Sequence, residues 1–112
     1  MAAYIIARIS IHDPERYTEY TKRTPSVLNQ YGGRFAARGS NVTTLEGPQE
    51  TRRIVVLEFD DADAAKAFYF SREYTEIRGH RDASSEGEFI IVEGYPEAEW
   101  SSALAASLAL SD

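Results

Sequence analysis

The order in which strand-like and helix-like segments follow one another limits the fold of this chain more than any other feature. Short segments with the two-residue alternation of strands are separated by longer segments with apolar residues three and four positions apart, as in amphipathic helices. The expected strands span residues 3–11, 34–39, 52–59 and 88–94, and the expected helices span residues 14–31 and 61–81, the second broken at 71–74. This order is the split βαβ arrangement, βαββαβ.

Residues that begin and end helices support this order. Asp13 and Pro14 suit a helix start, because an aspartate side chain accepts from free N–H groups and proline is tolerated in the first turn. Asp60 or Asp61 suits the start of the next helix, and the glycines at 32–33 suit the end of the first.

The predicted fold class is α+β. We expect a ferredoxin-like fold in which four strands form one antiparallel sheet with two helices on one face. Residues 41–45 are expected to prolong the second strand after a bulge at Gly39 and Ser40.

The other face of the sheet is predicted to be too apolar to stay in water. Its expected members are Tyr4, Ile6, Ala36, Ile54, Val56, Phe89 and Ile91. A second copy of the same sheet would cover it, so we expect a homodimer with facing sheets. Alternation alone leaves open which face meets the helices.

Composition excludes several classes of protein. The net charge is −6, from 12 basic and 18 acidic residues, whereas nucleic-acid binding draws on a basic surface. The chain has no cysteine, which excludes disulfides, thiolate metal sites and thiol catalysis. No apolar segment approaches the ~20 residues of a membrane span, and the N-terminal segment lacks the pattern of a signal peptide. We therefore expect a cytoplasmic protein that binds neither nucleic acid nor membrane.

The chain is expected to hold one domain over residues 1–96 and a tail over residues 97–112. Trp100, Leu104 and Leu108 recur every four residues in the tail, a spacing typical of an amphipathic helix. A frayed end is the alternative.

Several short motifs together resemble one known family. They are residues 12–17 (HDPERY), 31–35 (YGGRF), 38–39 (RG), 45–47 (LEG), 71–74 (SREY), Arg81 and 92–94 (VEG). As a set they resemble the DUF1330 family of small bacterial proteins of unassigned function, over residues 3–95. Arg72 departs from the pattern, since the family usually has proline there. The resemblance implies a dimeric α/β barrel, a fold shared with some small oxygenases, haem-degrading enzymes and isomerases, and fold by itself does not give function.

Two sets of polar residues are candidate ligand contacts. Arg8, Arg34, Arg38 and Glu58 are expected on one face of the sheet, where arginines could grip a carboxylate-bearing or phenolic ligand. The alternative is a structural network of ion pairs between strands or across the dimer.

The second set lies near the second helix and contains Tyr74 and Arg81. Arg81 matches the family pattern, and its structural alternative is a cation that pairs with the C-terminal end of a helix. His80 is expected to be an ordinary helix-end histidine. His12 and His80 fall on separate elements without metal-ligand spacing, so we expect no metal and no cofactor.

The sequence therefore favours a small dimeric protein that binds an organic ligand between sheet and helices, with catalytic residues left unassigned. One alternative is a non-catalytic protein-interaction or stress-associated module. The other is a cofactor-independent oxygenase or isomerase.

Overall fold

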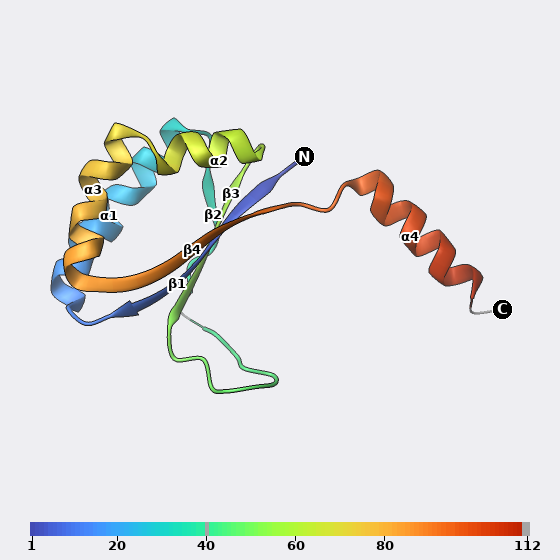
Figure 1. The fold of residues 1–112 in the computed structure, drawn as a ribbon, viewed down its shortest axis with the longest axis horizontal. Coiled ribbons are helices and arrows are strands. Elements are labelled where there is room, and N and C mark those ends of the chain that lie inside the picture. Colours follow the sequence, from blue (N-terminus) through green and yellow to red (C-terminus); the bar gives the residue numbers. More distant parts are fainter. Residues whose placement is uncertain (40, 111–112) are drawn as a thin grey trace.

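The computed structural model describes residues 1–39 and 41–110, and it confirms the predicted fold class. The elements are β1 (Ala3–Ile11), α1 (Pro14–Gln30), β2 (Arg34–Ala37), β3 (Arg53–Phe59), α2 (Ala62–Tyr69), α3 (Arg72–Ser84), β4 (Ser85–Glu93) and α4 (Glu97–Ala109). The sheet has the order β2-β3-β1-β4, and every neighbouring pair is antiparallel. α1, α2 and α3 cover one face of it, and α4 stands apart (Figure 1).

The core lies between these three helices and one face of β1 and β3. Ile5 and Ile9 of β1 and Leu57 of β3 are buried there, against aromatic side chains of the helices such as Phe68. Alternation alone did not show which face of the sheet meets the helices. In the structure the odd-numbered residues of both strands face the helices. Tyr4, Ile6, Ile54 and Val56 lie on the opposite, helix-free face.

The prediction for β4 was wrong by one residue in phase. Phe89 pairs with Ala7 and Ile91 pairs with Ile5, so both lie on the helix side of the sheet. Ile90 and Val92 lie on the helix-free face instead. Because β4 is apolar on both faces, the alternation of its residues does not show which of them face the helices. Its register with β1 determines this.

β2 is shorter than expected and ends at Ala37. Its pairing with β3 shifts between Phe35 and Ala37, so the bulge falls at Ala36, which is not a regular member of the helix-free face. Residues 41–45 form no strand, which corrects the predicted extension. Gly39, two residues after the end of β2, has a left-handed backbone conformation with φ of +72°. Ser40, the other expected bulge residue, lies outside the described residues.

Side chains cap the three helices that cover the sheet. Asp13 accepts a hydrogen bond from the backbone N–H of Arg16 at the start of α1. Asp61 does the same for Ala64 at α2, and Ser71 for Tyr74 at α3. The cap at Ser71 makes α2 and α3 separate helices, as the break at 71–74 predicts, and places the face of α3 that carries Tyr74 toward the core.

The C-terminal part of the described chain forms α4, in which every residue is exposed. Trp100, Leu104 and Leu108 form an apolar stripe along this helix. None of the helices within residues 1–39 and 41–110 is long and apolar enough to cross a membrane.

Candidate functional site

The arginines on the helix-free face are either paired or open to solvent. Arg34 and Glu58 face each other across β2 and β3 and form an ion pair. Arg8 lies on the same face, on β1, and is exposed. Arg34 and Glu58 therefore form an ion pair between strands. This is the structural network that the sequence offered as the alternative to a ligand site.

Arg52, which the sequence did not single out, is also fully engaged. Its guanidinium donates to both carboxylate oxygens of Glu50 at 3.0 Å and to Glu88 of β4 at 2.6 Å. The hydrogen bonds from Arg52 lower the pKa of Glu50 to about 2, so Glu50 stays ionised over the physiological range. These hydrogen bonds hold the loop before β3 against the sheet. They occupy Nε, Nη1 and Nη2 of Arg52, so we do not assign Arg52 to a ligand site.

Arg38 does not join Arg34 and Glu58, because the bulge at Ala36 breaks the alternation between positions 34 and 38. Its guanidinium lies 4.2 Å from the centre of the Phe35 ring and donates to the backbone carbonyl of Thr21 in α1 at 3.2 Å. That carbonyl would ordinarily accept from the N–H of residue 25, but Pro25 has none. Arg38 therefore supplies the hydrogen bond that Pro25 removes, and it bridges β2 to α1.

Arg81 is the most unusual charged residue of the described chain. Its side chain projects from α3 into the layer between helices and sheet and is 3% exposed. Its Cζ atom lies 4.0 Å from the ring centre of Phe89, on β4. Its Nε and Nη2 atoms are buried and have no hydrogen-bond partner among the described residues, and the nearest carboxylate oxygen, on Asp82, is 3.9 Å from Nη2.

Two buried tyrosines lie beside Arg81. The hydroxyls of Tyr20 in α1 and Tyr74 in α3 are hydrogen-bonded at 2.7 Å, and the Tyr20 ring centre is 6.0 Å from the Arg81 guanidinium. Burial raises the pKa of both phenols, and for Tyr20 the neighbouring Tyr74 raises it further. Burial lowers the pKa of Arg81, but electrostatic interaction with Tyr74, Tyr20, Asp82 and Tyr69 together outweighs it, so the net shift is upward. At neutral pH the cluster holds one cation and two neutral phenols.

A second arginine with an unused donor lies nearby, and sequence reasoning missed it. The Nε of Arg53, at the start of β3, is buried without a hydrogen-bond partner among the described residues. Its guanidinium lies 5.9 Å from the ring centre of Tyr17, whose pKa is raised by burial and lowered in part by Arg53. A signal was present, because Arg53 shares the alternation phase of Val55 and Leu57, which places it on the helix side.

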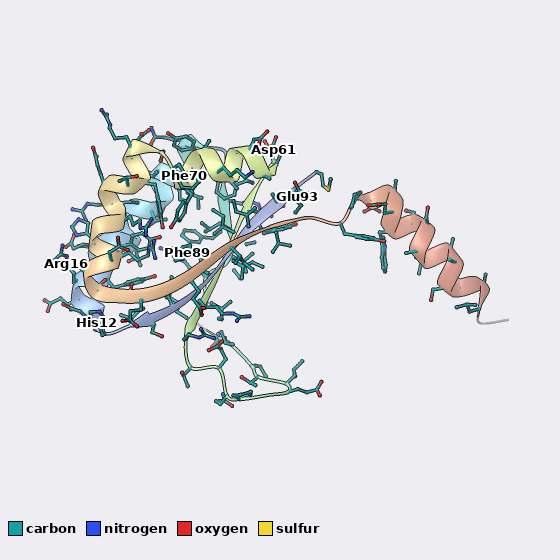
Figure 2. All side chains as sticks on the ribbon, in the orientation of Figure 1. His12, Arg16, Asp61, Phe70, Phe89 and Glu93 are labelled. Carbon is teal, nitrogen blue, oxygen red and sulfur yellow. The ribbon has the colours of Figure 1, made fainter. Side chains whose placement is uncertain are left out.

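Some of these groups line a small cavity between α1 and the sheet, and Arg81 and Tyr74 lie just outside its lining. Its lining includes Tyr17, Tyr20, Phe35, Arg38, Arg53 and Phe89. None of its lining residues is acidic, so the cavity is positive inside a chain of net charge −6. It admits about 20 Å³, room for roughly one water molecule. Figure 2 shows Phe89 between β4 and the helices, and its ring both lines this cavity and contacts the Arg81 guanidinium.

His80 lies outside this cluster. Its Nδ1 accepts a hydrogen bond from Nε of Arg16 at 3.2 Å on the surface between α1 and α3. Across residues 1–39 and 41–110 the structure contains no group of three side chains that could hold a metal ion. Of the six predicted site residues, Tyr74 and Arg81 come together in the interior, Arg38 lies at the edge of the cavity, and Arg8, Arg34 and Glu58 lie on the opposite face.

Comparison with known proteins identifies a family and a fold. Residues 2–95 match the family described as "Domain of unknown function (DUF1330)". No curated protein matches the chain. Among solved structures, the RPA0582 protein of unknown function from Rhodopseudomonas palustris is 18% identical, covers 85% of this chain and 83% of its own, and gives a TM-score of 0.71.

Two further structures share the fold at lower identity. SnoaB, a cofactor-independent oxygenase from Streptomyces nogalater, is 14% identical with a TM-score of 0.62, over 85% of this chain and 94% of its own. A dimeric ferredoxin-like protein of unknown function from Jannaschia sp. CCS1 is 13% identical with a TM-score of 0.59, over 84% of this chain and all of its own (100%). At these identities the likeness is one of fold alone.

Proposed function

The chain belongs to the DUF1330 family, and from that premise we propose that it binds a small organic anion between α1, α3 and the sheet. The observation that carries the proposal is the buried guanidinium of Arg81, whose Nε and Nη2 have no partner among the described residues. A buried donor left without an acceptor costs about 1–3 kcal/mol, more when it is charged. An acceptor supplied by a ligand would recover that cost.

The surroundings of Arg81 favour an aromatic or enolic acid over other anions. A carboxylate can accept two parallel hydrogen bonds from one guanidinium, which makes this pairing both strong and geometrically selective. The cavity beside it is lined by the rings of Tyr17, Phe35 and Phe89, which suit a flat apolar body. Arg53 offers a second cationic donor beside Tyr17.

A ligand of this size requires the cavity to open, because the free protein leaves room for only about one water. Arg38 and Phe35 form the wall that borders solvent, and Arg38 is exposed. Arg38 could release the carbonyl of Thr21 and swing aside or toward the anion, so we assign it the entrance of the site.

The proposal is for binding and names no reaction. SnoaB, which shares the fold, is an oxygenase that works without a cofactor. A base in this site would have to take a proton at neutral pH, and the phenols beside Arg81 have raised pKa values and stay protonated. One of the two hydroxyls donates to the other, so the Tyr20–Tyr74 pair keeps one free hydroxyl hydrogen, which we assign as the donor that orients the ligand.

We expect aromatic carboxylates such as benzoate and the hydroxybenzoates to raise the melting temperature, and the corresponding neutral amides to have no effect. At a ligand concentration one hundred times Kd the gain in free energy of unfolding is about 2.7 kcal/mol. Thermal unfolding monitored by fluorescence, followed by calorimetric titration of the best acid, measures this. Arg81→Gln should abolish the response, whereas Arg23→Gln, which alters an exposed arginine paired with Glu19, should keep it. An equal response from both variants, or none from any acid with the wild type, would refute the proposal.

We also propose a homodimer in which the helix-free faces of two sheets meet. Ile90 and Val92 are 58% and 42% exposed on this face, beside the half-buried Ile6 and Val56. Exposed apolar patches of this kind mark interaction surfaces. The neighbour from Jannaschia is described as dimeric, which supports a dimer here.

Val92→Lys should shift the protein from dimer to monomer, because two buried lysines without partners would face each other across the two-fold axis. Sedimentation velocity over a range of concentrations measures this. Leu45→Lys is the control, since Leu45 is 90% exposed in the loop before β3 and its replacement should leave the dimer intact. A wild-type protein that sediments as a monomer at every concentration would contradict the proposal.

A further inference from the structure

The apolar stripe of α4 has no cover within its own chain. Trp100, Leu104 and Leu108 are 51%, 41% and 60% exposed, and no residue of α4 is buried. α4 has 13 residues, a length at which an isolated helix in water is only marginally stable. Most helices of this kind owe their stability to packing of the apolar face, so this helix requires a surface to pack against.

The chain before α4 directs the helix away from its own domain. The N–H of Gly94 donates to the carbonyl of Ala2 at 2.7 Å, which holds the end of β4 against the start of β1. Pro96 then continues in an extended conformation, with φ of −61° and ψ of 139°. Figures 1 and 2 show α4 separated from the sheet and from the other helices, with its side chains touching none of them.

The same chain carries an unfilled apolar groove beside the outer edge of β4. Ile5, Tyr69, Phe70, Phe89, Ile90 and Ile91 line it, and we call it the Phe70 groove. Its volume is about 280 Å³, and Phe70 at the end of α2 is 76% exposed. An exposed phenylalanine next to exposed isoleucines on an edge strand is typical of a surface that another apolar element covers.

Two arginines lie beside the groove, Arg72 and Arg78. The guanidinium of Arg78 lies 5.3 Å from the ring centre of Tyr69, and Arg72 follows Phe70 by two residues. Each of these arginines also meets a carboxylate one turn later, Glu76 or Asp82, on the solvent side of α3. The only charged residues of α4 are Glu97 and Glu99, both acidic and both in its first turn.

From these observations we propose that α4 of one protomer docks in the Phe70 groove of a second copy, and that the exchange is reciprocal. The stripe would fill the groove, and Glu97 and Glu99 would lie near Arg72 and Arg78, where they would share these arginines with Glu76 and Asp82. In two copies related by a two-fold axis, each α4 fills the groove of the other copy. No helix or groove is left uncovered, so the assembly stops at a dimer. The groove lies at the β4 edge of the proposed sheet interface, so one dimer could contain both contacts. The proposal does not rest on the anion site.

Trp100 is the only tryptophan of the chain, so its fluorescence reports the environment of α4 directly. We expect wild-type protein to emit at short wavelength at high concentration and to shift to long wavelength on dilution. Phe70→Glu should emit at long wavelength at every concentration. Phe70 is exposed, so this variant should fold normally, which far-ultraviolet circular dichroism checks.

Mixing two variants separates exchange between copies from folding back within one. Trp100→Phe has an intact groove and no tryptophan, so an excess of it, equilibrated with Phe70→Glu, should return the emission of Phe70→Glu to short wavelength. The double variant Phe70→Glu/Trp100→Phe is the matched control and should leave that emission unchanged. Wild-type emission at long wavelength at all concentrations, emission unaffected by Phe70→Glu, or no recovery on mixing would each overturn the proposal.

Discussion

Arg81→Met is expected to make the ligand-free protein more stable and, at the same time, to abolish its response to organic acids. Methionine is unbranched, apolar and flexible, so it can pack against the Phe89 ring, and it needs no hydrogen-bond acceptor. Removing donors that are buried without partners should add about 1–3 kcal/mol to the free energy of unfolding. For a domain of this size each kcal/mol raises the melting temperature by roughly 4–8 °C. Thermal unfolding with and without an aromatic carboxylate measures both effects.

The two effects must have opposite signs for Arg81 to be a ligand-binding residue. Arg23→Met is the control, because Arg23 is exposed on α1 and pairs with Glu19; its stability should change by less than about 0.5 kcal/mol. If Arg81→Met is less stable than the wild type by several kcal/mol, the cation is a structural part of the core. The proposed anion site would then be wrong even though the fold remains.

Gly39→Ala should be among the most destabilising single substitutions outside the core, costing about 2–5 kcal/mol. Part of the cost is the left-handed backbone, with φ of +72°. The rest arises because a Cβ atom at this position would collide with the backbone carbonyl of Ile54 in β3. That carbonyl belongs to a strand and cannot move without disturbing the sheet. Denaturant unfolding of the two proteins under the same conditions gives the difference.

Gly47→Ala separates the two contributions to this cost. Gly47 also has a left-handed backbone, with φ of +89°, but a Cβ atom there would have no other atom within 4 Å. This substitution should cost only the backbone term, about 1–2 kcal/mol. If the two alanine variants prove equally stable, the close approach of Gly39 to β3 does not exist in solution.

The fold could be predicted from the sequence because each element carries its own period and its own boundary signals. Asp13, Asp61 and Ser71 cap the helices where their sequence context predicts, and β1 has one wholly apolar face. What failed was the phase of β4. Both of its faces are apolar, so only its register with β1 distinguishes them, and a register is a long-range property that no local pattern contains.

The candidate site was predictable only in part, for a similar reason. The resemblance pointed to Arg81 and Tyr74, which do lie together, but it gave no indication that Nε and Nη2 of the Arg81 guanidinium lack hydrogen-bond partners among the described residues. Arg34 and Glu58 were correctly expected near each other, and their pairing places them outside the interior. Arg38 was assigned to the wrong face because the bulge at Ala36, a departure of one residue, shifts the alternation after it.

The hydrogen bond from Arg38 to Thr21 also has a consequence for time scales. Because Pro25 has already removed the helical partner of that carbonyl, releasing Arg38 breaks no turn of α1 and needs no movement of the sheet. Exposed side chains change rotamer within picoseconds to nanoseconds, whereas helices and domains shift over microseconds or longer. Opening at this wall would therefore be rapid compared with the encounter of protein and ligand. The rate of association would then follow ligand concentration, with no slow conformational step to limit it.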